Sequence, residues 1–347
     1  MLLAMTGGQN DERMWYNGVM YENFRKFLEG KERISIIQAE NPDGDSLGSA
    51  LALDLMLGDK IGSLYCPVDI PKYLRYLMDW SRVTNEFDWK ADGYIILDTG
   101  SAVLLSKLLD DAAIRNKLEN TAVFVIDHHE TEPDLPFSFE STIEMVPATA
   151  DIAFRMAKEL GWPISSEAAE YLLAGLMSDT LGLTSNSVTG ETYRTAAELL
   201  DLGVNITEFE ERRRDYMKKS QRILDYKADL IKRVQYHLDG RLATVLIPFD
   251  DIREYSDEYN PNVLILEELR LVEGVEAAVA IKTYPDGKLT GKIRASKPIA
   301  EMMAGYFGGG GHQYAAGFRV YEEYDKVISE LVPLVDRLLK EVANEAI

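Results

Sequence analysis

Short apolar runs alternate along the first half of the chain with longer segments whose apolar residues recur at helical spacing. The runs are rich in β-branched residues, as strands buried on both faces are; they cover 33–37, 61–65, 93–97 and 121–126. The segments at helical spacing cover 21–28, 47–57, 73–78, 102–109, 148–160, 166–178 and 189–201. This alternation predicts an α/β domain in which a parallel sheet carries helices on both faces.

Turn residues mark where the first of these units changes direction. The acidic loop 41–45 contains Pro and Gly, which favour a turn after the strand 33–37. Ser46 is a good N-cap residue for the helix 47–57, and Gly58 predicts its end.

The second half has a different pattern. Residues 205–237 are charged, helical in period and free of Pro and Gly, so they predict a linker helix or helix pair. Its basic run, Arg212 to Arg214, is flanked by acids and is interpreted as a solvated helical face. Strands are then expected at 243–247, 276–283, 289–294 and 316–320, with an Asp-Gly hairpin turn at 284–288 and a final helix from about 322.

These patterns divide the chain into four parts. They are a lead-in at 1–32, a first domain at 33–203, a helical linker at 204–240 and a smaller α/β domain at 241–347. A length of 347 residues favours two domains, and 46% hydrophobic residues suffice for two cores.

Composition narrows the function classes. A net charge of −21 argues against holding long duplex nucleic acid, because that affinity comes from many Lys and Arg contacts. A short or small phosphorylated substrate stays compatible if metals and local cations offset the repulsion. No run of 18 apolar residues predicts a transmembrane helix, and the first residues lack a secretory pattern. A single cysteine, Cys66, suits a reducing cytosol, so we expect a cytoplasmic protein with no membrane partner.

Candidate metal ligands stand at four places where predicted strands or helices end. They are Asp43 with Asp45, then Asp98, then the triplet Asp127-His128-His129, and finally Asp179. A doubly wound sheet brings the carboxyl ends of its strands together, so these groups can converge. Gathered carboxylates repel one another unless cations lie among them. A mixed Asp/His set favours one or two Mn²⁺ ions, with Mg²⁺ or Co²⁺ as alternatives.

Each of these groups also has a purely structural interpretation. Asp43 and Asp45 can bond to their own turn, Asp98 can cap the next helix, and Asp179 can be an ordinary exposed helix end. The adjacent pair His128 and His129 has no evident use in packing, and the combination favours a metal site.

The order and spacing of these motifs resemble the DHH phosphoesterase superfamily, named for the triplet at 127–129. The second half resembles the DHH-associated domain, whose mark is a Gly-rich turn closed by His, here 308–312. The likeness runs from about 33 to about 338 and is greatest to the NrnA-like oligoribonucleases and 3′-phosphoadenosine 5′-phosphate phosphatases.

The resemblance implies a role for each matching residue. Asp43 and Asp98 would hold one metal, and Asp98 would bridge to a second metal held with Asp45, His128 and Asp179. Asp127 would orient His128, and His129 would face the scissile phosphate. A metal-bridging hydroxide would attack phosphorus.

One departure from the family pattern affects the first metal. The family usually has His four residues before the first Asp of the Asp-x-Asp loop, and here that position is Ala39. Gln38, Glu40, Asn41 or water would have to fill the gap. The loss predicts a weak two-metal enzyme, a one-metal enzyme or a nucleotide-binding protein derived from an enzyme.

The second domain is expected to recognise the substrate. Gly308, Gly309, Gly310 and Gly311 let backbone N–H groups approach a phosphate, and His312 and Arg294 would add donors. The alternative for the Gly run is a flexible surface loop. Lys282 and Lys288 are interpreted as surface charges of the hairpin.

The first functional hypothesis is a Mn²⁺-dependent phosphoesterase acting on short single-stranded RNA or DNA, or on a small nucleotide. The alternatives are a cyclic or linear dinucleotide phosphodiesterase and a nucleotide-binding protein with a weakened metal site. A family II pyrophosphatase shares the first-domain motifs but not the Gly-rich His turn. The active site is expected in the cleft between the domains, and a homodimer stays open.

Overall fold

A computed structural model describes residues 20–345 of the protein, so most of the predicted lead-in at 1–32 lies outside the described residues. The chain forms two compact units, 1–217 and 218–347. The boundary falls within the segment predicted as a linker, and the two helices of that segment each pack on a different unit.

The first unit is a six-stranded parallel sheet in the order β3-β2-β1-β4-β5-β6. Its strands are β1 (Ile34–Ile37), β2 (Ile61–Tyr65), β3 (Val83–Thr84), β4 (Gly93–Leu97), β5 (Ala122–Asp127) and β6 (Glu140–Ile143). This result confirms the predicted α/β class. The strand order reverses between β1 and β4, and ligands of doubly wound sheets bind beside such a reversal.

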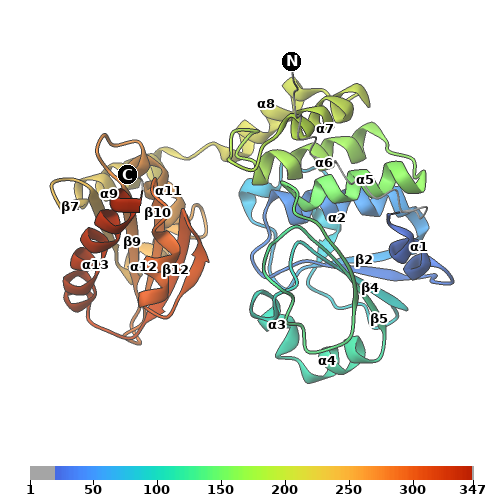
Figure 1. The fold of residues 1–347 in the computed structure, drawn as a ribbon, viewed down its shortest axis with the longest axis horizontal. Helices are drawn as coiled ribbons and strands as arrows, with labels where there is room; N and C mark the ends of the chain where they lie inside the picture. The colour runs from blue at the N-terminus through green and yellow to red at the C-terminus, as the bar shows by residue number, and fades with distance from the viewer. Residues whose placement is uncertain (1–19, 346–347) are drawn as a thin grey trace, which may run out of the picture. The chain divides into compact units, whose positions relative to one another are not determined.

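Helices cover both faces of this sheet (Figure 1). One face, with its core at Ile36 and Phe124, is covered by α1 (Glu22–Leu28), α2 (Gly44–Leu57), α5 (Thr149–Leu160) and α6 (Ser166–Asp179). The other face, with Ile37 and Val125, is covered by α3 (Ser106–Leu109) and α4 (Ala112–Glu119). Alternate strand residues thus enter different cores, which explains the continuous apolar runs.

Further elements complete the first unit. Helices α7 (Gly190–Asp201) and α8 (Ile206–Met217) lie outside the α2 and α6 layer (Figure 1). Short 3₁₀ turns connect the other elements: η1 (Gly58–Lys60), η2 (Lys72–Leu74), η3 (Trp80–Arg82) and η4 (Ala102–Leu105).

The second unit is a smaller six-stranded mixed sheet, ordered β11-β12-β10-β9-β8-β7, in which β8 and β9 are parallel. Its strands are β7 (Gln235–His237), β8 (Leu242–Ile247), β9 (Ala277–Thr283), β10 (Leu289–Ala295), β11 (Gly310–His312) and β12 (Ala315–Val320). Its helices are α9 (Gln221–Lys232), α10 (Phe249–Tyr255), α11 (Pro261–Arg270), α12 (Ala300–Tyr306) and α13 (Tyr324–Glu345). Helices α12 and α13 share a core with one sheet face, and α9 and α11 share a core with the other.

Three local predictions were wrong, each for a physical reason. Asp43 rather than Ser46 is the N-cap of α2, because its carboxylate accepts the N–H groups of Asp45 and Ser46, and Ser46 completes a capping box. The expected helix 73–78 is only the turn η2, since so short a segment gains few helical hydrogen bonds. The basic run in α8 is not a uniformly solvated face.

Two arginines of that run face the protein. Arg212 donates to the Tyr76 carbonyl at 2.8 Å and pairs with Glu170, and Arg213 pairs with Glu210. Arg214 alone of the three is exposed. Arg212 therefore holds α8 against the η2 region, a role that sequence spacing could not indicate.

Candidate metal centre

The predicted ligands gather at the carboxyl edge of the first sheet. Asp98 follows β4, and the triplet Asp127-His128-His129 ends β5 and continues beyond it. Asp45 lies in the first turn of α2, after β1, and Asp179 is the last residue of α6. The backbone of Asp98 has a φ of 63°, an uncommon value for a residue other than Gly, and such values cluster at functional sites.

One imidazole stands at the centre of three carboxylates. Nε2 of His128 lies 3.2 Å from Oδ2 of Asp179, 3.5 Å from Oδ1 of Asp98 and 3.9 Å from Oδ2 of Asp45. Two groups of three residues place ligand atoms within 4.8 Å of one another: Asp45 with His128 and Asp179, and Asp98 with His128 and His129. The sheet thus brings together residues that are more than 130 positions apart in the sequence.

The tautomer of His128 suits a metal ligand. Its Nδ1 lies 3.1 Å from the Val146 carbonyl, which can only accept, so Nδ1 carries the proton. Nε2 is buried and has no hydrogen-bond partner among the described residues. Nε2 lies among three carboxylates, a position that a proton fills in the metal-free protein and that a divalent cation can take.

The pKa shifts of the site residues are also consistent with a site that binds a cation. Burial, with the nearby charge of Asp179, raises the pKa of Asp45 to about 7. Burial and the charges of Asp45 and Asp43 raise the pKa of Asp98 well above its usual value. Burial opposes a charge on His128, but the carboxylates of Asp179 and Asp45 outweigh it and raise its pKa to about 9. These shifts show that the centre lacks positive charge.

Backbone and hydroxyl donors hold the carboxylates in place. Asp45 accepts the N–H groups of Thr149 at 2.6 Å and Ala150 at 2.9 Å, which are first-turn amides of α5. The Thr149 hydroxyl donates to Asp98 at 3.0 Å. Sequence reasoning missed Thr149 and Val146, because nothing in the segment 146–149 marks it as part of the site.

Asp127 differs from the expectation that it orients the ring of His128. Its Oδ1 lies 2.7 Å from Nδ1 of His129 and also accepts the backbone N–H groups of His128 and His129. Burial opposes the charge on Asp127, but the hydrogen bond and charge of His129 prevail and lower its pKa. Asp127 therefore holds the ring of His129, while Val146 holds that of His128.

The position of the first metal is poorer in ligands. Asp43 belongs to neither group of three in the described chain, and one of its oxygens caps α2. Ala39 lies two residues beyond the end of β1, is buried, and its carbonyl accepts from Sγ of Cys66 at 3.4 Å. Of the expected substitutes, Glu40 accepts from Ser106 at 2.8 Å and Asn41 is exposed. Gln38 is buried, and neither polar atom of its amide has a partner among the described residues.

The Gly-rich segment of the second unit is partly a strand. Residues 310–312 form β11, which pairs with β12, and nothing is described of the His312 side chain. A Cβ at Gly309 or Gly311 would overlap backbone atoms of β12, so packing requires these glycines. Gly308 has a φ of 73°, and Gly310 has open space around it.

A basic face lies on the same sheet. Lys282, Lys292 and Arg294 all point away from the core that contains Ile281 and Ile293, because strand residues alternate in direction.

The prediction that Lys282 is a surface charge was wrong: it is 8% exposed, and its Nζ donates to Asn260 at 3.1 Å. Burial and the charge of Lys292 lower its pKa to about 8, and burial also lowers the pKa of Arg294. Lys288 stacks over Tyr284 in the hairpin, as a surface charge does.

Comparisons with known proteins identify the class to which the first unit is similar. Residues 33–176 match the model of the DHH family, N-terminal domain. This region of the chain therefore matches the DHH family, which confirms the resemblance that its sequence motifs indicated.

The relatives are similar over different lengths. The bifunctional oligoribonuclease and PAP phosphatase NrnA of Thermus thermophilus is 27% identical over 315 residues, covering 90% of this chain and 91% of the relative. A probable manganese-dependent inorganic pyrophosphatase of Streptococcus agalactiae is 29% identical over 192 residues, covering 51% of this chain and 58% of the relative. The crystal structure of an exopolyphosphatase-related protein from Bacteroides fragilis has a TM-score of 0.81 at 22% identity, covering 92% and 97% of the two chains. No described helix has the length and apolar character needed to cross a membrane.

Proposed function

We propose that the protein is a divalent-metal-dependent phosphoesterase that hydrolyses short oligonucleotides or small nucleotide phosphates. The observation that carries the proposal is the buried Nε2 of His128, which is surrounded by the carboxylates of Asp45, Asp98 and Asp179 at 3.2 to 3.9 Å. The NrnA relative supports the substrate class because it is similar over nine-tenths of both chains. The pyrophosphatase relative and the mixed nitrogen and oxygen ligands favour Mn²⁺.

In this proposal, the site residues of the first unit have different roles. Asp45, Asp98, His128 and Asp179 would hold the cation, which when bound neutralises the carboxylates and polarises a phosphoryl oxygen and a water molecule. Asp127 fixes the ring of His129 at 2.7 Å. His129 is 31% exposed in its side chain, so it is accessible to a substrate phosphate and contacts it in this proposal. Thr149 and Val146 keep the ligands in position before the substrate arrives.

Recognition of the substrate phosphate would use the basic face of the second unit. Lys292 and Arg294 lie two residues apart on β10, and burial lowers the pKa of both. An anion bound there would relieve the repulsion between these cations. The assignment of this unit to the DHH-associated domain, and the cleft predicted between the domains, stay predictions.

The test is turnover of defined substrates by the purified protein. Short RNA of about two to five nucleotides is incubated with Mn²⁺, with Mg²⁺ and with a chelator. 3′-Phosphoadenosine 5′-phosphate is incubated under the same three conditions. We expect hydrolysis with Mn²⁺, none with the chelator, and recovery when Mn²⁺ is restored. Equal turnover of the same substrates in chelator would contradict a metal-dependent mechanism.

A second candidate is a nucleotide-binding protein with a weakened metal site. It is favoured by Ala39 and by the absence of Asp43 from the ligand groups of the described chain. It predicts that nucleotides bind by calorimetry while no tested metal supports turnover. Cyclic and linear dinucleotides, tested beside the short RNA, decide the remaining alternative of a dinucleotide phosphodiesterase.

A further inference from the structure

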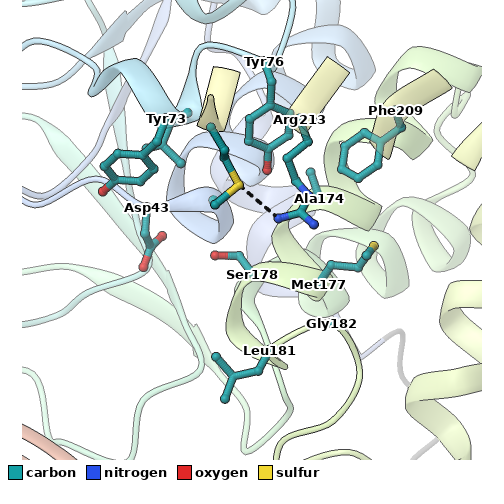
Figure 2. Close-up of a pocket in the computed structure, with 13 residues that line it drawn as sticks. Asp43, Tyr73, Tyr76, Ala174, Met177, Ser178, Leu181, Gly182, Phe209 and Arg213 are labelled. Atoms are coloured by element: carbon teal, nitrogen blue, oxygen red, sulfur yellow. Dashed lines mark hydrogen bonds between the residues drawn. The ribbon is translucent and has the colours of Figure 1, made fainter. Parts of the chain in front are cut away.

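A pocket of about 350 Å³ in the first unit is bounded on one side by Asp43, beside the candidate metal centre. Its volume lies within the ~300–1,000 Å³ of small-molecule sites. Figure 2 shows Asp43 and Tyr73 at one side of the pocket, Ser178 and Arg213 at its middle and Phe209 at the other side. Met177, Leu181 and Met217 supply further apolar walls.

Two aromatic rings of the pocket lining are buried, and a third is exposed. Tyr76 and Phe209 are buried and meet edge to face, with ring centroids 5.6 Å apart. Arg212 ties α8 to the Tyr76 carbonyl, so the two segments that carry these rings are held together. Tyr73 lines the pocket and is 46% exposed, so a planar ligand in the pocket can reach its ring from solvent. The two methionines add polarisable surface that adapts to the outline of a flat ring.

Arg213 gives the pocket one donor with a weak partner. Its Nε and Nη2 bond to the carboxylate of Glu210, at 3.0 and 2.7 Å. Its Nη1 donates to the thioether sulfur of Met217 at 3.4 Å, and such sulfurs are weak acceptors. A ligand oxygen or ring nitrogen would be a better acceptor for this group than the sulfur is.

We propose that this pocket binds a nucleobase of the substrate while the adjoining phosphate lies at the metal centre. This inference rests on the proposed function and names the part of the substrate that the first unit recognises. A base combines a flat aromatic face for Tyr73 and the methionines with acceptors on its edge for Arg213. A second phosphate is disfavoured, since Glu210 neutralises Arg213 and Asp43 is acidic.

The test removes the ring of Tyr73 and the base of the substrate, separately and together. Wild type and Tyr73→Ala are compared on a dinucleotide and on two analogues, each lacking one base. We expect Tyr73→Ala to raise KM for the dinucleotide about tenfold, within the range of base–aromatic stacking. On the analogue that lacks the base bound in the pocket, wild type and variant should have the same KM. Arg213→Met should raise KM for the dinucleotide but not for that analogue.

The matched control is Trp89→Ala, which removes an aromatic ring of similar exposure, 51%, that does not line the pocket. It should leave KM unchanged for every substrate. If Tyr73→Ala leaves KM unchanged, or acts equally on all three substrates, the pocket does not bind a base and the inference is overturned.

Calorimetry separates this outcome from a failure of the proposed function. Binding of adenosine and guanosine 5′-monophosphates is measured on wild type and Tyr73→Ala without relying on turnover. Weaker binding by the variant alone, in a protein that hydrolyses nothing, would support the pocket and contradict the enzyme. Equal binding by both proteins would overturn the pocket, whatever the activity.

Discussion

Both units gather charges of one sign, which are negative in the first unit and positive in the second. In the first unit, Asp45, Asp98 and Asp179 are gathered in a buried centre, and burial with mutual repulsion raises the pKa of Asp45 and Asp98. In the second unit, Lys282 is buried and the Lys292 side chain beside it is exposed. Desolvation and the charge of a neighbouring cation lower the pKa of both. A ligand of opposite charge would relieve the repulsion in each region, and in the second unit Glu267, 3.8 Å from Arg294, already does so in part.

The spacing of the charges differs and indicates the size of the ligand. The acidic groups come from loops and helix ends, so their ligand atoms lie within 4.8 Å of one another and can surround a single ion. The basic groups lie along neighbouring strands, where side chains on one face repeat every ~6–7 Å along a strand. Such spacing suits a larger anion with several oxygens. The comparison shows that loops at a sheet edge can bring charged groups close enough to surround one ion. Charged groups on a sheet face lie farther apart.

The largest effect is expected from Asp98→Asn, which keeps the shape of the side chain and removes its charge. Turnover of short RNA with Mn²⁺ should fall by more than the ~100-fold typical of residues that support a metal ligand. The rise in melting temperature on adding Mn²⁺ should also be lost. Without metal the variant should be more stable than wild type, because one repelling carboxylate is gone.

Asp69→Asn is the control for this change. Asp69 is exposed in the loop after β2, and it belongs to neither group of three ligands in the described chain. It should change neither turnover nor the response to Mn²⁺. Wild-type activity in Asp98→Asn would show that the acidic centre is not the site of reaction.

A smaller effect, an increase in metal binding, is expected from Ala39→His, which adds a ligand to the acidic centre. The new imidazole would lie just beyond the end of β1, and it should tighten binding of a second metal by about 10- to 100-fold, as other single groups around metals do. Manganese counted per chain after gel filtration should rise from about one to about two. Ala39→Leu fills the same space without a ligand and should leave the count unchanged. A count of two in the wild type would show that the missing His costs no ion.

The smallest effect is expected from Lys282→Met in the basic face. The folded pKa of Lys282 is about 8, below its usual 10.5, so between these values the unfolded chain binds more protons and stability rises with pH. Below pH 8 the buried charge destabilises the protein fully, and its removal should stabilise the fold by roughly 1–3 kcal/mol at pH 7. Denaturant unfolding at pH 7 and pH 10 should show this gain at pH 7 and little of it at pH 10. The control is Lys288→Met, which removes a hairpin charge that is 26% exposed in its side chain. A pH-independent difference for Lys282→Met would contradict the assigned cause.

Much of the fold could be predicted because local patterns agree with it. The apolar runs became β1, β2, β4 and β5, and the helices at 148–160, 166–178 and 189–201 lie within about one residue of the observed ones. Short elements such as β3, β6 and α12 were missed, because a few residues carry too little periodicity to be seen.

The candidate ligands were predictable for a related reason. Asp43 and Asp98 follow strands and Asp127 ends one, and strand ends meet at one edge in a parallel sheet. The partners of these groups were not predictable. Thr149 reaches Asp98, Val146 reaches His128, and Asp127 holds His129, because contacts between distant segments depend on how α5 and β5 pack.

By itself, the sequence determined the α/β class, the order of the main strands and helices, and the acidic and imidazole groups at the sheet edge. Periodicity and turn residues act over a few positions, so they can be read locally. Only the tertiary structure decided the tautomer of His128, the burial of Lys282 and the pocket between Tyr73 and Arg213. Those properties arise where segments far apart in the chain meet, and burial and charge at such meetings depend on every neighbour at once.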